Sequence, residues 1–136
     1  MPELTIEAKV ENLDRVLAFA DGNLEAADCP MKAQMQFDVA LEELFVNIAH
    51  YAYRHVGGGD ATVRYTFDEA TRTAAFTLID SDMPYDPLAR ADPDITLPAE
   101  QRDIGGLGIY MVKKSMDSVA YEYRDGRNVL RIEKRI

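Results

Sequence analysis

The sequence of 136 residues contains one cysteine, Cys29, and no tryptophan. A single cysteine excludes an internal disulfide and makes a reducing compartment the default expectation. No stretch approaches the roughly eighteen consecutive apolar residues that a membrane helix requires, and the N-terminus has no basic region followed by an apolar run. We therefore expect a cytoplasmic protein without a membrane segment.

Positive charge is also scarce. Fifteen lysines and arginines stand against 24 acidic residues, which gives a formal net charge of -9 at pH 7. Phosphate repulsion disfavours direct binding to nucleic acid as the main function of such a chain, whereas a basic protein partner would be attracted. The length is that of one domain and no linker divides the chain, so we predict a single domain over residues 1–136.

Apolar periodicity predicts the order strand, helix, helix, strand, strand, loop, helix, strand, strand. Alternation predicts a strand over residues 3–10, and helical spacing predicts helices over residues 12–26 and 30–54. Two hairpins follow from the other alternating segments. The arrangement predicts an α+β two-layer sandwich, with helices on one face of a mixed, mostly antiparallel sheet. The later predicted elements are strands over 61–67, 73–80, 118–124 and 128–135, and a helix opened by residues 105–108.

A polar ridge is predicted along the second helix. At 100° per residue, Asn47, His50 and Arg54 fall within about 40° of Glu43, away from the apolar stripe. Most such ridges are solvated helix faces. A glutamate and an asparagine one turn apart could instead share a Mg²⁺ ion and a water, because carboxylate and carbonyl oxygens are the hard ligands that this cation accepts.

Two further signals flank the long segment 81–107, which has no convincing period. Asp80 ends a strand just before it, where a carboxylate can meet a ligand, although a capping or turn aspartate is the commoner interpretation. Gly105, Gly106 and Gly108 open a helix, and backbone N–H groups there could approach a phosphate. A plain hinge is the alternative for these glycines.

Taken in this order, the three signals resemble those of the GHKL ATPase superfamily, and most closely those of its anti-sigma-factor serine-protein kinases. The segment ALEELFVNIAHYAY (40–53) resembles the N-box, and DSDMPYDPL (80–88) resembles the first glycine box. Residues 94–135 resemble the lid, the second glycine box and the final hairpin. The resemblance covers about residues 35–135 and implies the GHKL, or Bergerat, nucleotide-binding fold.

The resemblance also implies that the chain binds ATP and Mg²⁺. Asn47 would be the metal ligand, Glu43 the general base, and Asp80 the acceptor of a hydrogen bond from the adenine amino group. An ATP lid would span residues 88–104. The implied phosphate-binding segment comprises Gly105, Gly106, Leu107 and Gly108.

Asp82 departs from the family pattern, which has glycine at this place in the first box. Its side chain and charge would lie at the adenine site and weaken ATP binding unless the chain adjusts around it.

The resemblance implies a function as a kinase that transfers the γ-phosphate of ATP to a serine of an anti-anti-sigma (STAS-type) protein. It also implies binding of a sigma factor and a homodimer. The alternative is an interaction module that sequesters a regulatory protein without phosphate transfer, for which Asp82 is the indication. Glu43 favours the kinase, because a non-enzymatic relative has no need for it. A detached histidine-kinase ATPase domain is a third, less favoured interpretation.

Overall fold

The computed structural model describes residues 1–53, 56–89 and 107–136. The predicted order of strands and helices is confirmed, with two short 3-10 helices, η1 and η2, in addition. None of the described helices is long and apolar enough to cross a membrane. The elements are β1 (Glu3–Glu7), η1 (Val10–Asn12), α1 (Leu13–Ala26), α2 (Met31–Tyr51), β2 (Asp60–Asp68), β3 (Thr73–Asp80), η2 (Pro87–Ala89), α3 (Leu107–Ser115), β4 (Ser118–Arg124) and β5 (Arg127–Arg135).

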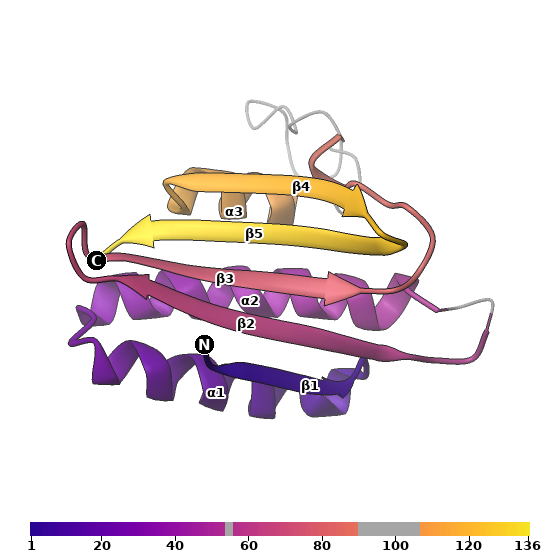
Figure 1. Cartoon of the computed structure of the whole chain (residues 1–136), viewed down its shortest axis with the longest axis horizontal. Coiled ribbons are helices and arrows are strands. Elements are labelled where there is room, and N and C mark those ends of the chain that lie inside the picture. The colour runs from indigo at the N-terminus through magenta and orange to yellow at the C-terminus, as the bar shows by residue number, and fades with distance from the viewer. Residues whose placement is uncertain (54–55, 90–106) are drawn as a thin grey trace.

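The strands form one five-stranded sheet in the order β1-β2-β3-β5-β4. Each of the four neighbouring pairs is antiparallel, so the sheet lacks the parallel pairing that a mixed sheet would contain among these strands. The three α-helices lie together behind this sheet in the view of Figure 1. The predicted α+β two-layer sandwich, with helices on one face, is therefore confirmed.

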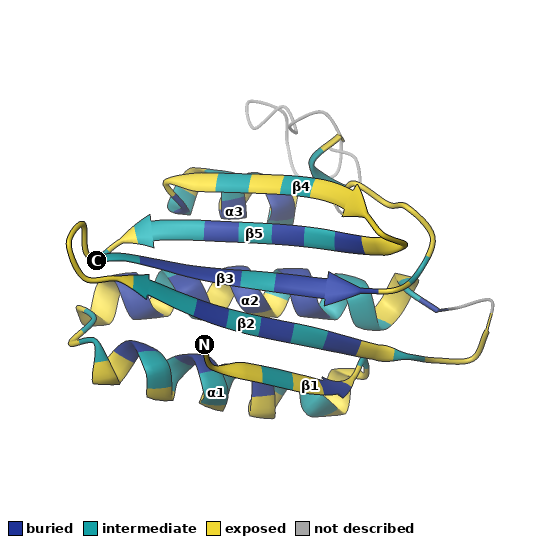
Figure 2. Ribbon diagram, viewed as in Figure 1, coloured by how far each residue is buried: buried dark blue, intermediate teal, exposed yellow. Residues whose placement is uncertain are grey.

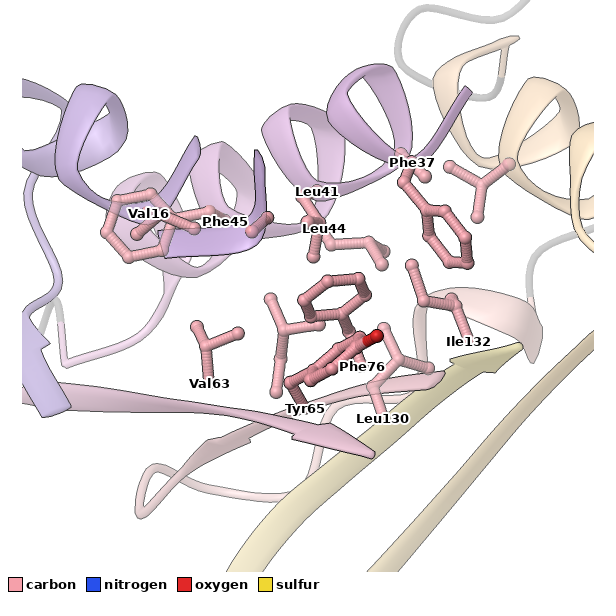
Figure 3. Packing of buried hydrophobic residues seen from close by; sticks show 14 of the residues in the cluster. Val16, Phe37, Leu41, Leu44, Phe45, Val63, Tyr65, Phe76, Leu130 and Ile132 are labelled. Atoms are coloured by element: carbon pink, nitrogen blue, oxygen red, sulfur yellow. The ribbon is translucent and has the colours of Figure 1, made fainter. Parts of the chain in front are cut away.

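Strand alternation builds the core between the two layers. Buried and less buried residues alternate along β2, as the colours of Figure 2 show. Phe76 of β3 packs edge-on against Phe37 of α2, with ring centroids 5.3 Å apart, and it also contacts Tyr65 of β2 (Figure 3). Burying one such side chain stabilises the fold by about 1.5–3 kcal/mol. These contacts hold α2 firmly on the sheet.

Two element boundaries differ from the predictions. The first strand ends at Glu7 rather than at residue 10, because Val10 begins η1, which Asn12 ties back by donating to the Glu7 carbonyl at 2.8 Å. The second helix ends at Tyr51 rather than at residue 54, since Ala52 is already extended.

Tyr53 explains the early end of α2. Its φ of 61° lies in the left-handed region, which is uncommon for a bulky residue. The phenol holds this conformation, because it donates to the Asp60 carbonyl at 2.8 Å and accepts from the Ser81 N–H at 2.6 Å. The turn after α2 is thereby tied to the start of β2 and to the end of β3.

Candidate functional site

Asp80 lies at the C-terminal end of β3, where the strand leaves the core. Only 7% of the residue is exposed. Its Oδ1 accepts hydrogen bonds from Asn128 Nδ2 at 2.9 Å and from the Asp82 N–H at 3.1 Å. Burial raises the pKa of the Asp80 carboxyl, and these two donors oppose the rise by stabilising the ionised form. Both described bonds reach Oδ1, so Oδ2 is the oxygen left for a ligand.

Asn128 of β5 is paired with Asp80 across the sheet and is itself buried. Its Nδ2 also donates to the Met83 carbonyl at 3.0 Å, while its Oδ1 accepts from the Tyr85 N–H at 3.0 Å and from the Tyr121 hydroxyl. A flipped amide would turn oxygen toward a carboxylate and a carbonyl, so the orientation is determined. Asn128 therefore holds both the Asp80 carboxylate and the segment that follows it.

Asp82 fits into this segment without needing the freedom of glycine. Its φ is not in the left-handed region, and its N–H closes a short turn onto Asp80. Its negative charge adds to the upward shift of the Asp80 pKa, as the smallest of the four contributions. The backbone thus accommodates the departure from the family pattern, and the electrostatic effect of Asp82 on Asp80 is secondary to burial.

A cavity of about 240 Å³ adjoins Asp80, between the C-terminal half of α2 and the segment that follows β3. Leu44 and Ile48 of α2 and Leu130 of β5 form apolar walls, and Asn47 contributes a polar group. Apolar walls with a few convergent polar groups are typical of small-molecule sites. Drug-sized ligands occupy pockets of about 300–1,000 Å³, so this cavity suits one ring system rather than a whole nucleotide.

A larger hollow of about 780 Å³ covers the open face of the sheet. Its lining includes Arg64, Thr77 and Arg131 but none of the predicted site residues that the structure describes. The cavity beside Asp80 is therefore the better candidate site, because the chemistry-bearing residues gather there.

Glu43 and Asn47 lie one turn apart on α2, and both are partly buried rather than forming a solvated face. Asn47 Nδ2 donates to Glu43 Oε1 at 3.4 Å. Because the amide nitrogen faces Glu43, the carbonyl oxygen of Asn47 is the atom left for a cation. His50 of the same predicted ridge is exposed, and Arg54 lies outside the described residues.

The oxygen atoms available as metal ligands fit a magnesium ion that is bound jointly with a nucleotide. The described residues contain no group of three or more His, Cys, Asp or Glu side chains that could hold a metal alone. Mg²⁺ is usually bound through one or two protein groups, several waters and the phosphates of its substrate. A single asparagine oxygen beside this cavity would match that pattern if a nucleotide were bound there.

Gly108, the second residue of α3, lies directly against Glu43, and a Cβ at this position would overlap the glutamate carboxylate. Leu107, which begins α3, is exposed. Gly105, Gly106 and residues 90–104 of the predicted lid lie outside the described residues, whereas Leu88 and Ala89 belong to η2. The structure therefore brings Asp80, Asp82, Asn47, Glu43 and Gly108 into one connected region.

Comparison with known proteins identifies the family. Residues 6–134 match the histidine kinase-like ATPase domain family. The chain belongs to this family. The serine/threonine-protein kinase BtrW of Bordetella bronchiseptica is 26% identical over 100 residues, which cover 72% of this chain and 69% of that protein. The predicted relation to GHKL ATPases and serine/threonine-protein kinases is confirmed, and membership in an ATPase family implies ATP binding.

Sequence reasoning missed Asn128 and Tyr53. Asn128 alternates in phase with Leu130 and Ile132, so a polar residue stands on the core-facing side of β5. That phase is a usable signal, since a buried amide needs several partners. Tyr53 carried no comparable signal, because it stands after a helix whose end the apolar stripe did not locate.

Proposed function

We propose that this protein binds ATP with Mg²⁺ and transfers the γ-phosphate to a serine of a STAS-type anti-anti-sigma protein. One observation carries the proposal. Asp80 and Asn47 line the same cavity, Asn47 is hydrogen-bonded to Glu43, and the Glu43 carboxylate lies against the first turn of α3. These contacts support a path from a proposed adenine pocket to the predicted phosphate-binding segment.

Base recognition falls to Asp80. Its Oδ2 is an acceptor at the edge of an apolar cavity, where an exocyclic amine can donate to it. Adenine and guanine both carry an exocyclic amine, so the choice of adenine follows the family resemblance. The Asn128 amide keeps the acceptor in place.

Phosphate transfer falls to Asn47 and Glu43. The Asn47 oxygen would hold Mg²⁺, which would supply positive charge to offset that of the ATP phosphates. The serine oxygen of the partner forms a bond to the γ-phosphorus as the bond to the bridging oxygen of ADP breaks. Glu43 takes the serine proton, because its carboxylate is the base nearest to α3 among the residues of this path.

The proposed partners are inferred from the family resemblance. The proposal includes a sigma factor bound by the chain, a homodimer, a cytoplasmic location and an anti-sigma role in transcription regulation. The net charge of -9 supports a protein partner with a basic surface over direct contact with nucleic acid.

The test separates binding from transfer. Asn47→Ala should abolish Mg²⁺-dependent ATP binding in calorimetry, whereas Glu43→Ala should keep the dissociation constant within about threefold and lose transfer, because it removes only the base. Transfer is measured with γ-labelled ATP and purified STAS-domain proteins from the same genome, with serine-to-alanine partners as the control. Normal ATP binding by the Asn47 variant would contradict the assignment of Asn47 as the metal ligand. Phosphate transfer by the Glu43 variant would contradict the assignment of Glu43 as the general base.

A second candidate function is an interaction module without phosphate transfer. The observation in its favour is Asp82, whose charge lies beside the base-reading carboxylate. Capture of a partner by a wild-type protein that binds no ATP would favour this function.

A further inference from the structure

Gly108 does not use the conformational freedom for which glycine is usually selected. It is the second residue of α3, a helix that spans Leu107–Ser115, and its φ is not in the left-handed region. Glycine within a helix is about 0.5–1 kcal/mol less favourable than alanine. Backbone geometry alone therefore gives no reason for glycine at this position.

Space gives the reason. A Cβ at Gly108 would overlap Cδ, Oε1 and Oε2 of Glu43, so the glutamate carboxylate occupies the place that a side chain would take. Gly22 in α1 is the contrasting case, since no described atom outside its own local backbone lies within 4 Å of a Cβ there.

We propose that Gly108 is a positioning residue for Glu43, in addition to any contact of this segment with phosphate. Asn47 contacts one oxygen of the Glu43 carboxylate, and the bare backbone of α3 lies against the same group. The segment that contains the predicted phosphate-binding glycines thereby also sets where the Glu43 carboxylate lies. Of the two experiments below, the one on phosphate transfer rests on the proposed function, whereas the one on stability does not.

The expected consequence of a methyl group is displacement of the carboxylate. The glutamate end is flexible, so Gly108→Ala should leave the protein folded while it displaces the Glu43 carboxylate from its present position. A shift of about 1 Å in a positioned catalytic group can lower a rate by about 100-fold.

The first experiment is a stability cycle on the nucleotide-free protein. Gly108→Ala is made in the wild-type, Glu43→Ala and Glu43→Gln backgrounds, and urea unfolding midpoints are compared. In the Glu43→Ala background the alanine should raise the midpoint, as Gly22→Ala should in every background, because only helix propensity changes. In the wild type and with Glu43→Gln, which keeps the bulk, it should raise the midpoint less or lower it. An equal shift in all three backgrounds overturns the positioning role.

The second experiment compares ATP affinity with phosphate transfer. Gly108→Ala should lower the transfer rate by at least about tenfold more than it lowers ATP affinity. The Gly108→Ala/Glu43→Ala double variant should transfer no more slowly than Glu43→Ala alone. Equal losses of ATP affinity and transfer rate would mean that Gly108 acts only in binding the ATP phosphates. A wild type without transfer defeats the proposed function, and the stability cycle still decides the positioning role.

Discussion

Two carboxyl groups of this protein, the buried Asp80 and the partly buried Asp38, have raised pKa values for the same leading reason but stand in opposite surroundings. Burial is the largest cause for both. Asp80 is met by donors, the Asn128 amide and the Asp82 N–H, which stabilise its charge. Asp38 is met by further acidic groups of α1, so its charge has no such support.

The Asp38 site lies where α2 packs beside α1 (Figure 1). Burial, a hydrogen bond with Asp21 and the charges of Asp21 and Glu25 raise the pKa of Asp38 to about 7. One oxygen of Asp21 and one of Asp38 are buried without a donor among the described residues. A proton held between the two carboxyls would satisfy both oxygens.

The contrast shows how to tell a binding carboxylate from a structural one. Donors around Asp80 fix one oxygen in its charged form and leave the other for a ligand. Acceptors around Asp38 favour the protonated form, which joins two helices and has little left to bind. A raised pKa alone does not separate these cases, whereas the hydrogen-bond partners do.

Among the variants that test this comparison, Asp80→Asn should have the largest effect. An asparagine that accepts from Asn128 and Asp82 must turn its own N–H₂ toward the base, where it meets the adenine amine donor to donor. ATP affinity should fall by about 100-fold, which is about 2.7 kcal/mol. Calorimetry with purine riboside triphosphate, which lacks the amine, is the control and should show a much smaller loss. Unchanged ATP affinity would mean that Asp80 does not read the base.

Asn128→Ala should have an intermediate effect. It frees the Asp80 carboxylate and the Met83–Tyr85 segment, so ATP affinity should fall by about tenfold, and the preference for ATP over purine riboside triphosphate should shrink. Asn23→Ala is the matched control, because this amide donates only to the Phe19 carbonyl within α1 in the described hydrogen bonds. If the affinities for ATP and for purine riboside triphosphate fell equally, Asn128 would have a purely structural role.

The smallest effect concerns Asp38→Asn and appears in stability. A carboxyl with a raised pKa keeps a proton that the unfolded chain has released, so the free energy of unfolding falls between about pH 4 and pH 7. Asparagine has no such proton to lose. The variant should be more stable at pH 8 by about 1–2 kcal/mol, after discounting for solvent screening, with a flatter pH profile.

Urea unfolding from pH 4 to pH 8 measures this difference. Glu42→Gln, on the exposed side of α2, is the control and should change stability by less than about 0.5 kcal/mol. A variant that keeps the wild-type slope would show that the Asp21–Asp38 pair does not hold a proton.

The sequence predicts the fold well because most of the elements are amphipathic. Apolar spacing follows burial on β2 and along the stripe of Phe37, Leu41 and Leu44, which are all buried. It failed at the end of α2, where the long-range bonds of Tyr53 rather than local propensity decide the boundary.

The site was predictable where its residues are close in sequence or at an element end, as with Glu43, Asn47 and Asp80. It was less predictable where distant segments meet. Asn128 and Asp80 are 48 residues apart, and their pairing depends on β5 lying beside β3 in the sheet. The contact between Gly108 and Glu43 likewise requires α3 to pack on α2.

Calorimetric titration of the wild-type protein with ATP, with and without Mg²⁺, tests the central claim most directly. The account predicts binding in the micromolar range that depends on Mg²⁺. In the described hydrogen bonds one oxygen of Asp80 and the carbonyl oxygen of Asn47 remain available, and the Asp82 backbone adapts without glycine. Absence of binding in both titrations would contradict it and would leave the interaction module as the function of this fold.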